Sequence, residues 1–416
     1  MRNTCSHCAC FDILLTLAGF ILYLSDIVLD IWKIWLFYQE GSYILMGVLI
    51  FLFLGSPVLL QIFSWLLYAD YKDKPKTSVD IFLNKHSLLV IFHVFQLGIF
   101  VRFASVVEIS VRRLLGRDPI PEDTARHLKH DLFFVRLVET FSESAPQLML
   151  MLSTTFMREE IGLLTGLKTA ESIITITLNV LLYHQAMRKF IHDKSKMGWD
   201  SAVVFFLWNL FLITARVASL ALFASVLPFF VVVHFLTLWI LLVLWAWQQQ
   251  TDFMDGPGGE WLYRATIGLI LYFSWFDVND EKTKLKSNIY HVLTMLDSGL
   301  LIGLWWWMRV YNTSSHSPCP LDLLVPISII VLLYSSGLAL KFVHDTWLRP
   351  KKPELVIDHP RAHRGDVEEA SSGERQVEAE VDSVQPTPRS MSLTPTTEPL
   401  TGVKKRMSVM AANFYS

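Results

Sequence analysis

The chain has 416 residues, of which 52% are hydrophobic and 18% are charged, and its formal net charge is −2. A soluble domain carries about 25% charged residues, so this composition excludes an ordinary soluble protein. The near-neutral balance gives no indication of a nucleic-acid partner.

Ten apolar segments follow one another along the chain and predict an all-α membrane protein. They cover residues 11–37, 43–69, 86–109, 131–155, 160–187, 199–226, 228–250, 259–276, 288–310 and 323–347. Segments of this length are typical of helices that enter a lipid bilayer. The first is too long for the core of a signal peptide and no small-residue cleavage site follows it, so we expect it to be retained.

Clusters of basic residues in the loops indicate which segments cross the membrane, because cytosolic loops are enriched in Lys and Arg. Basic loops follow the second, third and fifth segments and contain Lys72, Lys74, Lys76, Lys85, Arg112, Arg113, Arg117, Arg188, Lys189, Lys194 and Lys196. Cytosolic loops on both sides of 86–109 predict that this segment enters the membrane and returns. Segment 259–276 follows the sequence DGPGG and is interpreted in the same way.

The resulting architecture has eight spanning helices plus two re-entrant helices, arranged in two parallel pseudo-repeats with both termini in the cytosol. The repeats would occupy residues 1–187 and 188–348, and hydropathy and charge are the basis for pairing them. Residues 349–402 are rich in Pro, Ser, Thr and Glu and predict a disordered cytosolic tail. Residues 403–416 predict a short amphipathic C-terminal helix.

Acidic side chains share one face of the first apolar segment. At about 100° per residue, Asp12 and Asp30 fall at the same angle and Asp26 lies about 40° away. The stretch VETFSESAPQL repeats the pattern, since Glu139 and Glu143 are four residues, or one helical turn, apart. Other charged residues at membrane depth are Arg102, Arg136, Arg216 and Asp297.

Each charge at the bilayer centre costs about 2.5–3.5 kcal/mol or more, so these groups must face the bundle interior, water or one another. Two interpretations follow. The charges could pair and lock helices together, or they could form a polar track through the membrane. A track of both signs suits a zwitterionic lipid head group better than an inorganic ion, because ion pores typically carry rings of one sign.

The sequence contains no GxSxG, Walker or HExxH motif. We therefore expect a protein that is not an enzyme and that has no cofactor and no catalytic metal. The CSHCAC stretch near the start has a single CxxC, which is a weak metal signal, and juxtamembrane acylation or reduced thiols are the favoured interpretations.

Several stretches resemble the XK-related family of membrane proteins. They are LYLSDIVLDIW at 22–32, QIFSWLLYADY at 61–71, RLVETFSESAPQL at 136–148, FFLWNLFLITAR at 205–216, QQQTDFMDGPGGEWLYR at 248–264 and YFSWFDV at 272–278. The likeness extends to about residue 350, and the chain looks most like the family's caspase-activated apoptotic phospholipid scramblases.

The resemblance implies a plasma-membrane protein that moves phospholipids between leaflets without ATP and exposes phosphatidylserine on dying cells. It implies the same eight spanning and two re-entrant helices, and a single-span partner of the immunoglobulin superfamily. It also implies charged residues within the bilayer, which map to Asp12, Asp26, Asp30, Arg102, Glu139, Glu143, Arg216 and Asp297. Two other functions stay open: an ion channel or solute transporter, and a membrane subunit that stabilises a partner.

The tail carries a candidate caspase site, AEVDS, in which cleavage would fall between Asp382 and Ser383. Ala379 departs from the acid that is usual at the first position, and Asp366 in RGDVE is a poorer alternative. Beyond the site, the spacing of four apolar residues predicts one face of a helix. These residues are Val403, Met407, Met410 and Phe414. The helix could bind anionic lipid at the membrane surface, or, as the family suggests, hold the scramblase shut until cleavage.

Overall fold

The computed structural model describes residues 2–69, 77–116, 121–158, 162–188, 198–251, 253–254, 256–276, 283–312 and 320–348. The chain divides into two units: one contains Met1–Arg349 with Thr401–Ser416, and the other contains Pro350–Leu400. All described parts belong to the first unit. The candidate caspase site and the predicted C-terminal helix lie outside the described residues.

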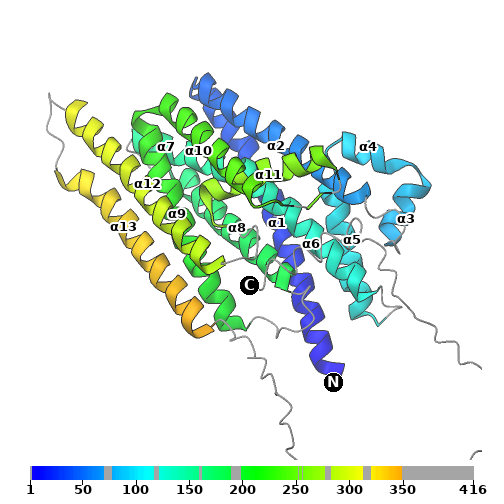
Figure 1. Cartoon of the computed structure of the whole chain (residues 1–416). Helices are drawn as coiled ribbons and strands as arrows, with labels where there is room; N and C mark the ends of the chain where they lie inside the picture. Colours follow the sequence, from blue (N-terminus) through cyan, green and yellow to red (C-terminus); the bar gives the residue numbers. More distant parts are fainter. Residues whose placement is uncertain are drawn as a thin grey trace, which may run out of the picture. The chain divides into compact units, whose positions relative to one another are not determined.

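Every regular element in the described ranges is a helix, which confirms the prediction of an all-α chain (Figure 1). In chain order the elements are α1 (Arg2–Gln39), α2 (Tyr43–Ala69), α3 (Ser78–Lys85), α4 (Leu88–Val94), α5 (Gly98–Leu114), α6 (Glu122–Glu139), η1 (Thr140–Ser144), α7 (Ala145–Arg158), α8 (Leu163–Arg188), α9 (Trp199–Val226), α10 (Pro228–Gln248), α11 (Pro257–Phe273), α12 (Thr283–Asn312), α13 (Pro320–Val343) and η2 (His344–Leu348). The elements η1 and η2 are π-helical turns.

Five described helices are long and apolar enough to cross a membrane: Tyr43–Tyr68, Trp199–Val226, Pro228–Gln248, Leu285–Tyr311 and Leu324–Trp347. The chain is therefore a multi-pass membrane protein by the length and composition of its helices. Three further segments that the sequence predicts to cross carry charged side chains and are not among the five: 11–37 in α1, 131–155 in α6 and α7, and 160–187 in α8.

Helix α9 occupies the centre of the bundle. Of its most apolar stretch, 56% is buried inside the protein, against 11% for α10. It packs against α7, α8, α10, α12 and α13, and Figure 1 shows α12 and α13 at one edge of the bundle and α3, α4 and α5 at the opposite edge. The apolar side chains on the outer faces of α2, α10 and α12 are exposed, as expected for helices that face lipid.

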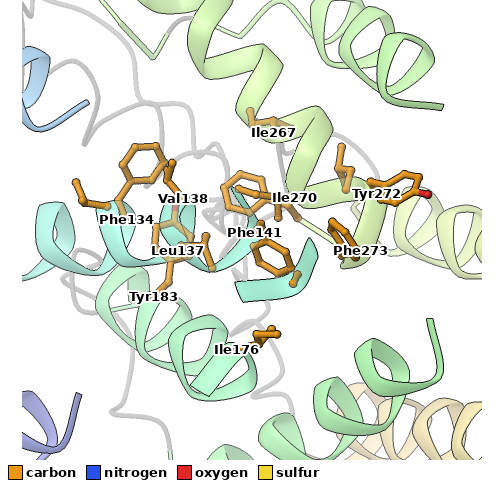
Figure 2. Close-up of a cluster of buried hydrophobic side chains, with 14 of the residues drawn as sticks. Phe134, Leu137, Val138, Phe141, Ile176, Tyr183, Ile267, Ile270, Tyr272 and Phe273 are labelled. Atoms are coloured by element: carbon orange, nitrogen blue, oxygen red, sulfur yellow. The ribbon is translucent and has the colours of Figure 1, made fainter. Parts of the chain in front are cut away.

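A cluster of aromatic and aliphatic side chains joins the first and second halves of the chain at the bundle core. Figure 2 shows that its members come from α6 with η1, from α8 and from α11. They include Phe134, Leu137, Val138, Phe141, Ile176, Tyr183, Ile267, Ile270, Tyr272 and Phe273. The rings of Phe141 and Phe273 stack with centroids 6.2 Å apart. Because this cluster excludes water, polar groups beside it must pair with one another.

The segment predicted at 86–109 is divided into α4 and α5. Gln96 lies between them with a φ of 62°, a left-handed conformation that ends the helix. Gly98 begins α5, and a Cβ atom there would lie 2.5 Å from Oε1 of Gln61. The glycine therefore permits a close approach of α5 to α2, and apolar character by itself gave no indication of the break.

The segment predicted at 131–155 begins earlier and is interrupted. Helix α6 begins at Glu122, and the π turn η1 separates it from α7. Pro146 explains the interruption, because proline has no N–H to donate and its ring clashes with the carbonyl one α-helical turn earlier. In the wider turn, the N–H of Ala145 donates to the carbonyl of Thr140. The turn therefore moves Glu143 away from the position of a straight α-helix.

Candidate functional site

A lysine and two aspartates form the centre of a buried ion network between α1 and α8. The ammonium of Lys168 donates to Oδ1 of Asp26 and lies 3.1 Å from Oδ1 of Asp30 and 3.4 Å from Oε2 of Glu171. The side chains of Lys168, Asp26 and Asp30 are 4%, 5% and 2% exposed. Asp26 and Asp30 therefore face the protein interior and not the lipid.

A second pair lies one helix away, on α6. The guanidinium of Arg136 donates to Oε2 of Glu139, and it also stands 4.8 Å from the centre of the Tyr23 ring on α1. Both members of the pair are buried. Tyr23 lies one helical turn before Asp26 on α1, so this pair and the lysine cluster adjoin at the same part of α1.

The π turn η1 connects the two clusters. Ser144 donates to Oδ2 of Asp26 at 3.2 Å, and the hydroxyls of Ser142 and Ser56 are 2.6 Å apart. Asn179 of α8 donates to Thr140 at 2.7 Å. Helices α1, α2 and α8 therefore all hold the same short turn through polar side chains.

Glu143 lies at the inner side of this turn and is 5% exposed. Its Oε1 accepts a long hydrogen bond of 3.4 Å from the amide of Gln147, one turn later on α7. We define the central network by its charged members, which are Asp26, Asp30, Arg136, Glu139, Glu143, Lys168 and Glu171. Five carboxyl groups in this set face two cations, so the set has an excess of acid.

A second network lies in the other half of the bundle. Arg216 of α9 donates to Oδ2 of Asp297 at 2.6 Å and to Ser298 at 2.9 Å. On the opposite side of the carboxylate, Nε2 of His234 is 3.1 Å from Oδ1 of Asp297. Arg216 is buried, whereas the side chains of Asp297 and His234 are 25% and 17% exposed. The outer part of this network therefore lies nearer the surface of the bundle than the central network does.

Arg102 belongs to a third cluster, at the edge of the bundle that contains α4 and α5. Its Nη1 is 3.5 Å from Oδ2 of Asp131, and Nε and Nη2 donate to the hydroxyl and the carbonyl of Ser64. His93 lies 3.1 Å from the same hydroxyl. A cavity of about 30 Å³ next to these groups is large enough to hold a water molecule.

The structure thus brings Asp26, Asp30, Arg136, Glu139 and Glu143 together. It pairs Arg216 with Asp297 in the second network and places Arg102 in the third cluster. The side chain of Asp12 lies outside the described set. Sequence reasoning missed Lys168 and Asp131 as ion partners, and it missed the pairing of His234 with Asp297. The signal for Lys168 was present: a lysine in the apolar segment 160–187 needs a buried acid nearby.

The arrangement has a chemical consequence. Removing one partner of a buried ion pair leaves an uncompensated charge, which costs about 3–5 kcal/mol. The central network therefore holds its helices together in the described conformation, while its excess of carboxyl groups favours cationic groups over anionic ones. A polar group that entered between α1 and α8 would meet carboxylates as soon as the two helices separated.

Comparisons with known proteins agree on one family. A family model described as XK-related protein matches residues 14–350. Three relatives named XK-related protein 8 are similar over most of their length. That of Tetraodon nigroviridis is 38% identical over 84% of this chain and 88% of its own. Those of Gasterosteus aculeatus and Pan troglodytes are 36% and 34% identical, covering 86% and 82% of this chain and 91% and 84% of their own.

Proposed function

The chain belongs to the XK-related family of membrane proteins, and from this membership we propose that it is an ATP-independent phospholipid scramblase of the plasma membrane. The comparisons confirm the resemblance that the sequence motifs indicated. In this proposal the protein exposes phosphatidylserine on dying cells after a caspase has cut its tail. The substrate is a phospholipid that moves down its gradient, so no nucleotide site is required.

The central network is the observation that carries the proposal. A protein that needed only stability could replace buried ion pairs with apolar side chains at little or no cost. Here charged groups line the interface of α1 with α8 and η1, inside a bundle with an apolar exterior. Polar head groups need such a lining to cross the hydrocarbon layer, while the acyl chains remain in lipid. We interpret the described conformation, with its acids enclosed, as the closed state.

The proposed topology has eight spanning and two re-entrant helices in two parallel pseudo-repeats, with both termini in the cytosol. Five helices that are long and apolar enough to cross a membrane support this topology, and so do the basic residues in the loops. The re-entrant pieces correspond to α4 with α5 and to α11. Polar backbone at membrane depth is tolerated where protein covers it, and most of the α11 side chains are buried or half-buried.

Activation in this proposal is the removal of a C-terminal inhibitor. Cleavage between Asp382 and Ser383 separates the helix that carries Val403, Met407, Met410 and Phe414 from the membrane part of the protein. The sequence supports this step, because the cleavage motif lies in a polar segment without periodicity and the helix follows it. The partners proposed are phospholipids, the caspase and a single-span membrane protein of the immunoglobulin superfamily, and co-purification from cells tests the last of these.

A liposome assay tests the proposed function. Purified full-length protein is reconstituted with fluorescent phospholipids and treated with an executioner caspase, and lipid movement is followed by bleaching the outer leaflet. We expect scrambling after cleavage and little before it. Asp382→Ala removes the cut and should keep the protein inactive, whereas Asp366→Ala is the matched control and should behave like the wild type. Absence of lipid movement from the cleaved protein, with ion or solute flux in its place, would replace the proposal with a channel or transporter.

A further inference from the structure

Asp26 and Asp30 enclose a site that fits one ammonium group. In the described conformation, Lys168 fills the site with its own ammonium, which hydrogen-bonds Asp26 and lies 3.1 Å from Asp30. The remaining carboxylate oxygen of Asp30, Oδ2, accepts no hydrogen bond of normal geometry, although the residue is only 1% exposed; the side chain of Gln147 is near the carboxylate but does not complete such a bond. A buried acceptor without a donor is costly, so this site has capacity for a further donor.

The geometry favours an ammonium over a metal ion. Within the described ranges, no group of three His, Cys, Asp or Glu side chains is placed to hold a metal. An ammonium has three donors and needs separate acceptors around it. Asp26, Asp30 and Glu171 supply these acceptors to Lys168 from two helices. The lipids that carry a primary ammonium in the head group are those with ethanolamine or serine.

The site lies one helix away from the lipid. The opposite face of α1 is apolar and exposed, with Val28 63% and Ile31 54% accessible. Lys33 reaches from α1 to the hydroxyl of Thr165 on α8 at 3.3 Å, next to the site. Separation of α1 from α8 would therefore break the contacts of Lys168 and leave two carboxylates facing the membrane interior.

We propose that Asp26 and Asp30 bind the ammonium of aminophospholipids, and that Lys168 occupies this site in the closed chain as an internal competitor. The inference rests on the proposed scramblase function and adds to it a head-group contact and a residue that blocks it. Lys168 acts as a positioning residue, because it holds the two carboxylates away from lipid until the helices part.

The test uses the intact, uncleaved chain in liposomes with acyl-labelled lipids. Lys168→Gln removes the competitor, and we expect phosphatidylethanolamine and phosphatidylserine to move at least about tenfold faster than in the intact wild type. Phosphatidylglycerol, which has no amine, should accelerate less. Lys33→Gln is the matched control: it also removes a buried ammonium between α1 and α8, but the bond it loses is to a hydroxyl. It should leave the intact chain closed.

Chemical rescue tests the role of the ammonium itself. In a background with Cys5, Cys8, Cys10 and Cys319 replaced by Ser, Lys168→Cys should be as active without cleavage as Lys168→Gln. Alkylation with 2-bromoethylamine in detergent rebuilds an ammonium on a side chain of nearly the same length, and mass spectrometry confirms the modification. We expect the alkylated protein to become inactive again until the tail is cut.

A second measurement tests the inference if the Lys168→Gln variant does not fold. Asp30→Asn keeps Lys168 paired with Asp26, and in the cleaved chain it should reduce the preference for amine-bearing lipids over phosphatidylglycerol. The inference is overturned if Lys168→Gln speeds all three lipids equally or none of them, or if cleaved Asp30→Asn keeps the wild-type preference. Absence of scrambling by the cleaved wild type would instead remove the proposed function.

Discussion

At the scale of single residues, the environment of an ion pair decides what the pair does. Arg136 and Glu139 on α6 are 4% and 5% exposed, and the guanidinium also covers the Tyr23 ring. Arg158 and Glu40 form another pair between α7 and the end of α1, but their side chains are 45% and 36% exposed. Water screens the second pair and not the first, so the same chemistry has different energetic weight at the two places.

We therefore predict that Arg136→Leu lowers the free energy of unfolding by about 3–5 kcal/mol, because Glu139 is left as a buried charge without its partner. Arg158→Leu should change it by about 0–1 kcal/mol. Thermal unfolding of the two variants in the same detergent measures the difference. Similar melting temperatures for both would show that Arg136 is not part of a buried pair.

The sequence could predict which side chains of the site share one face of a helix. Asp26 and Asp30 lie on one face because the α-helical period fixes their relative angle. Lys168, the partner of both, lies 142 residues after Asp26 in the chain. No local period relates the two positions, so the pairing depends on how α1 and α8 pack, and the sequence of one chain does not reveal it.

At the scale of elements, one π turn adjusts the register between α6 and α7. A π turn is equivalent to an α-helix into which one residue has been inserted. Removing that residue should restore a continuous α-helix, in which the residues before and after the turn face the same sides of the bundle as they do now. In η1, Ser142 is half-buried and its side chain bonds Ser56 and the carbonyl of Glu139. The apolar faces of α6 and α7 both pack on the bundle.

Deletion of Ser142 should therefore be tolerated better than deletion of Leu150 in α7. The first converts η1 to a continuous α-helix, loses the two hydrogen bonds of the Ser142 hydroxyl, worth about 1 kcal/mol each, and places Pro146 inside an α-helix, which costs about 3 kcal/mol. The second rotates the rest of α7 by about 100° and exposes its buried face. Size-exclusion profiles and melting temperatures of the two deletions give the comparison. Equal loss of folded protein in both would contradict the interpretation of η1 as a one-residue insertion.

Sequence reasoning found the long helices and missed their interruptions for a physical reason. Apolar content marks residues that avoid water, and it does not distinguish a continuous helix from two helices that meet in protein. The break at Gln96 depends on the close approach of Gly98 to α2. Pro146 is a local signal in the sequence for the interruption at η1. Proline is also common at the first position of an ordinary helix, so the residue by itself did not predict a π turn.

At the scale of the whole molecule, α9 and the aromatic cluster join the two halves, and the exterior is apolar. Tyr43 and Phe229 stand at corresponding places in the two proposed repeats, at the starts of α2 and α10, and are 62% and 84% exposed. The proposed topology puts both outside the cell. Trp199, 67% exposed at the start of α9, belongs to the cytosolic side.

Cysteine labelling in whole cells tests this topology. In a background without native cysteines, Tyr43→Cys and Phe229→Cys should react with a membrane-impermeant maleimide, whereas Trp199→Cys should react only after permeabilisation. The positive-inside rule gives the reason, since basic residues precede Trp199 in the chain. Labelling of Trp199→Cys in intact cells would show that the proposed orientation of the helices, or their arrangement in two parallel repeats, is wrong.

The pairing of Asp26 with Lys168 has a consequence for synthesis. The ribosome makes the acid 142 residues before its counterion, an interval on the order of ten seconds at about 5–20 residues per second. During that interval α1 has acidic groups and no Lys168 to neutralise them. Stable insertion of α1 into the membrane therefore either waits for α8 or depends on the insertion machinery to cover the acidic groups until α8 is made.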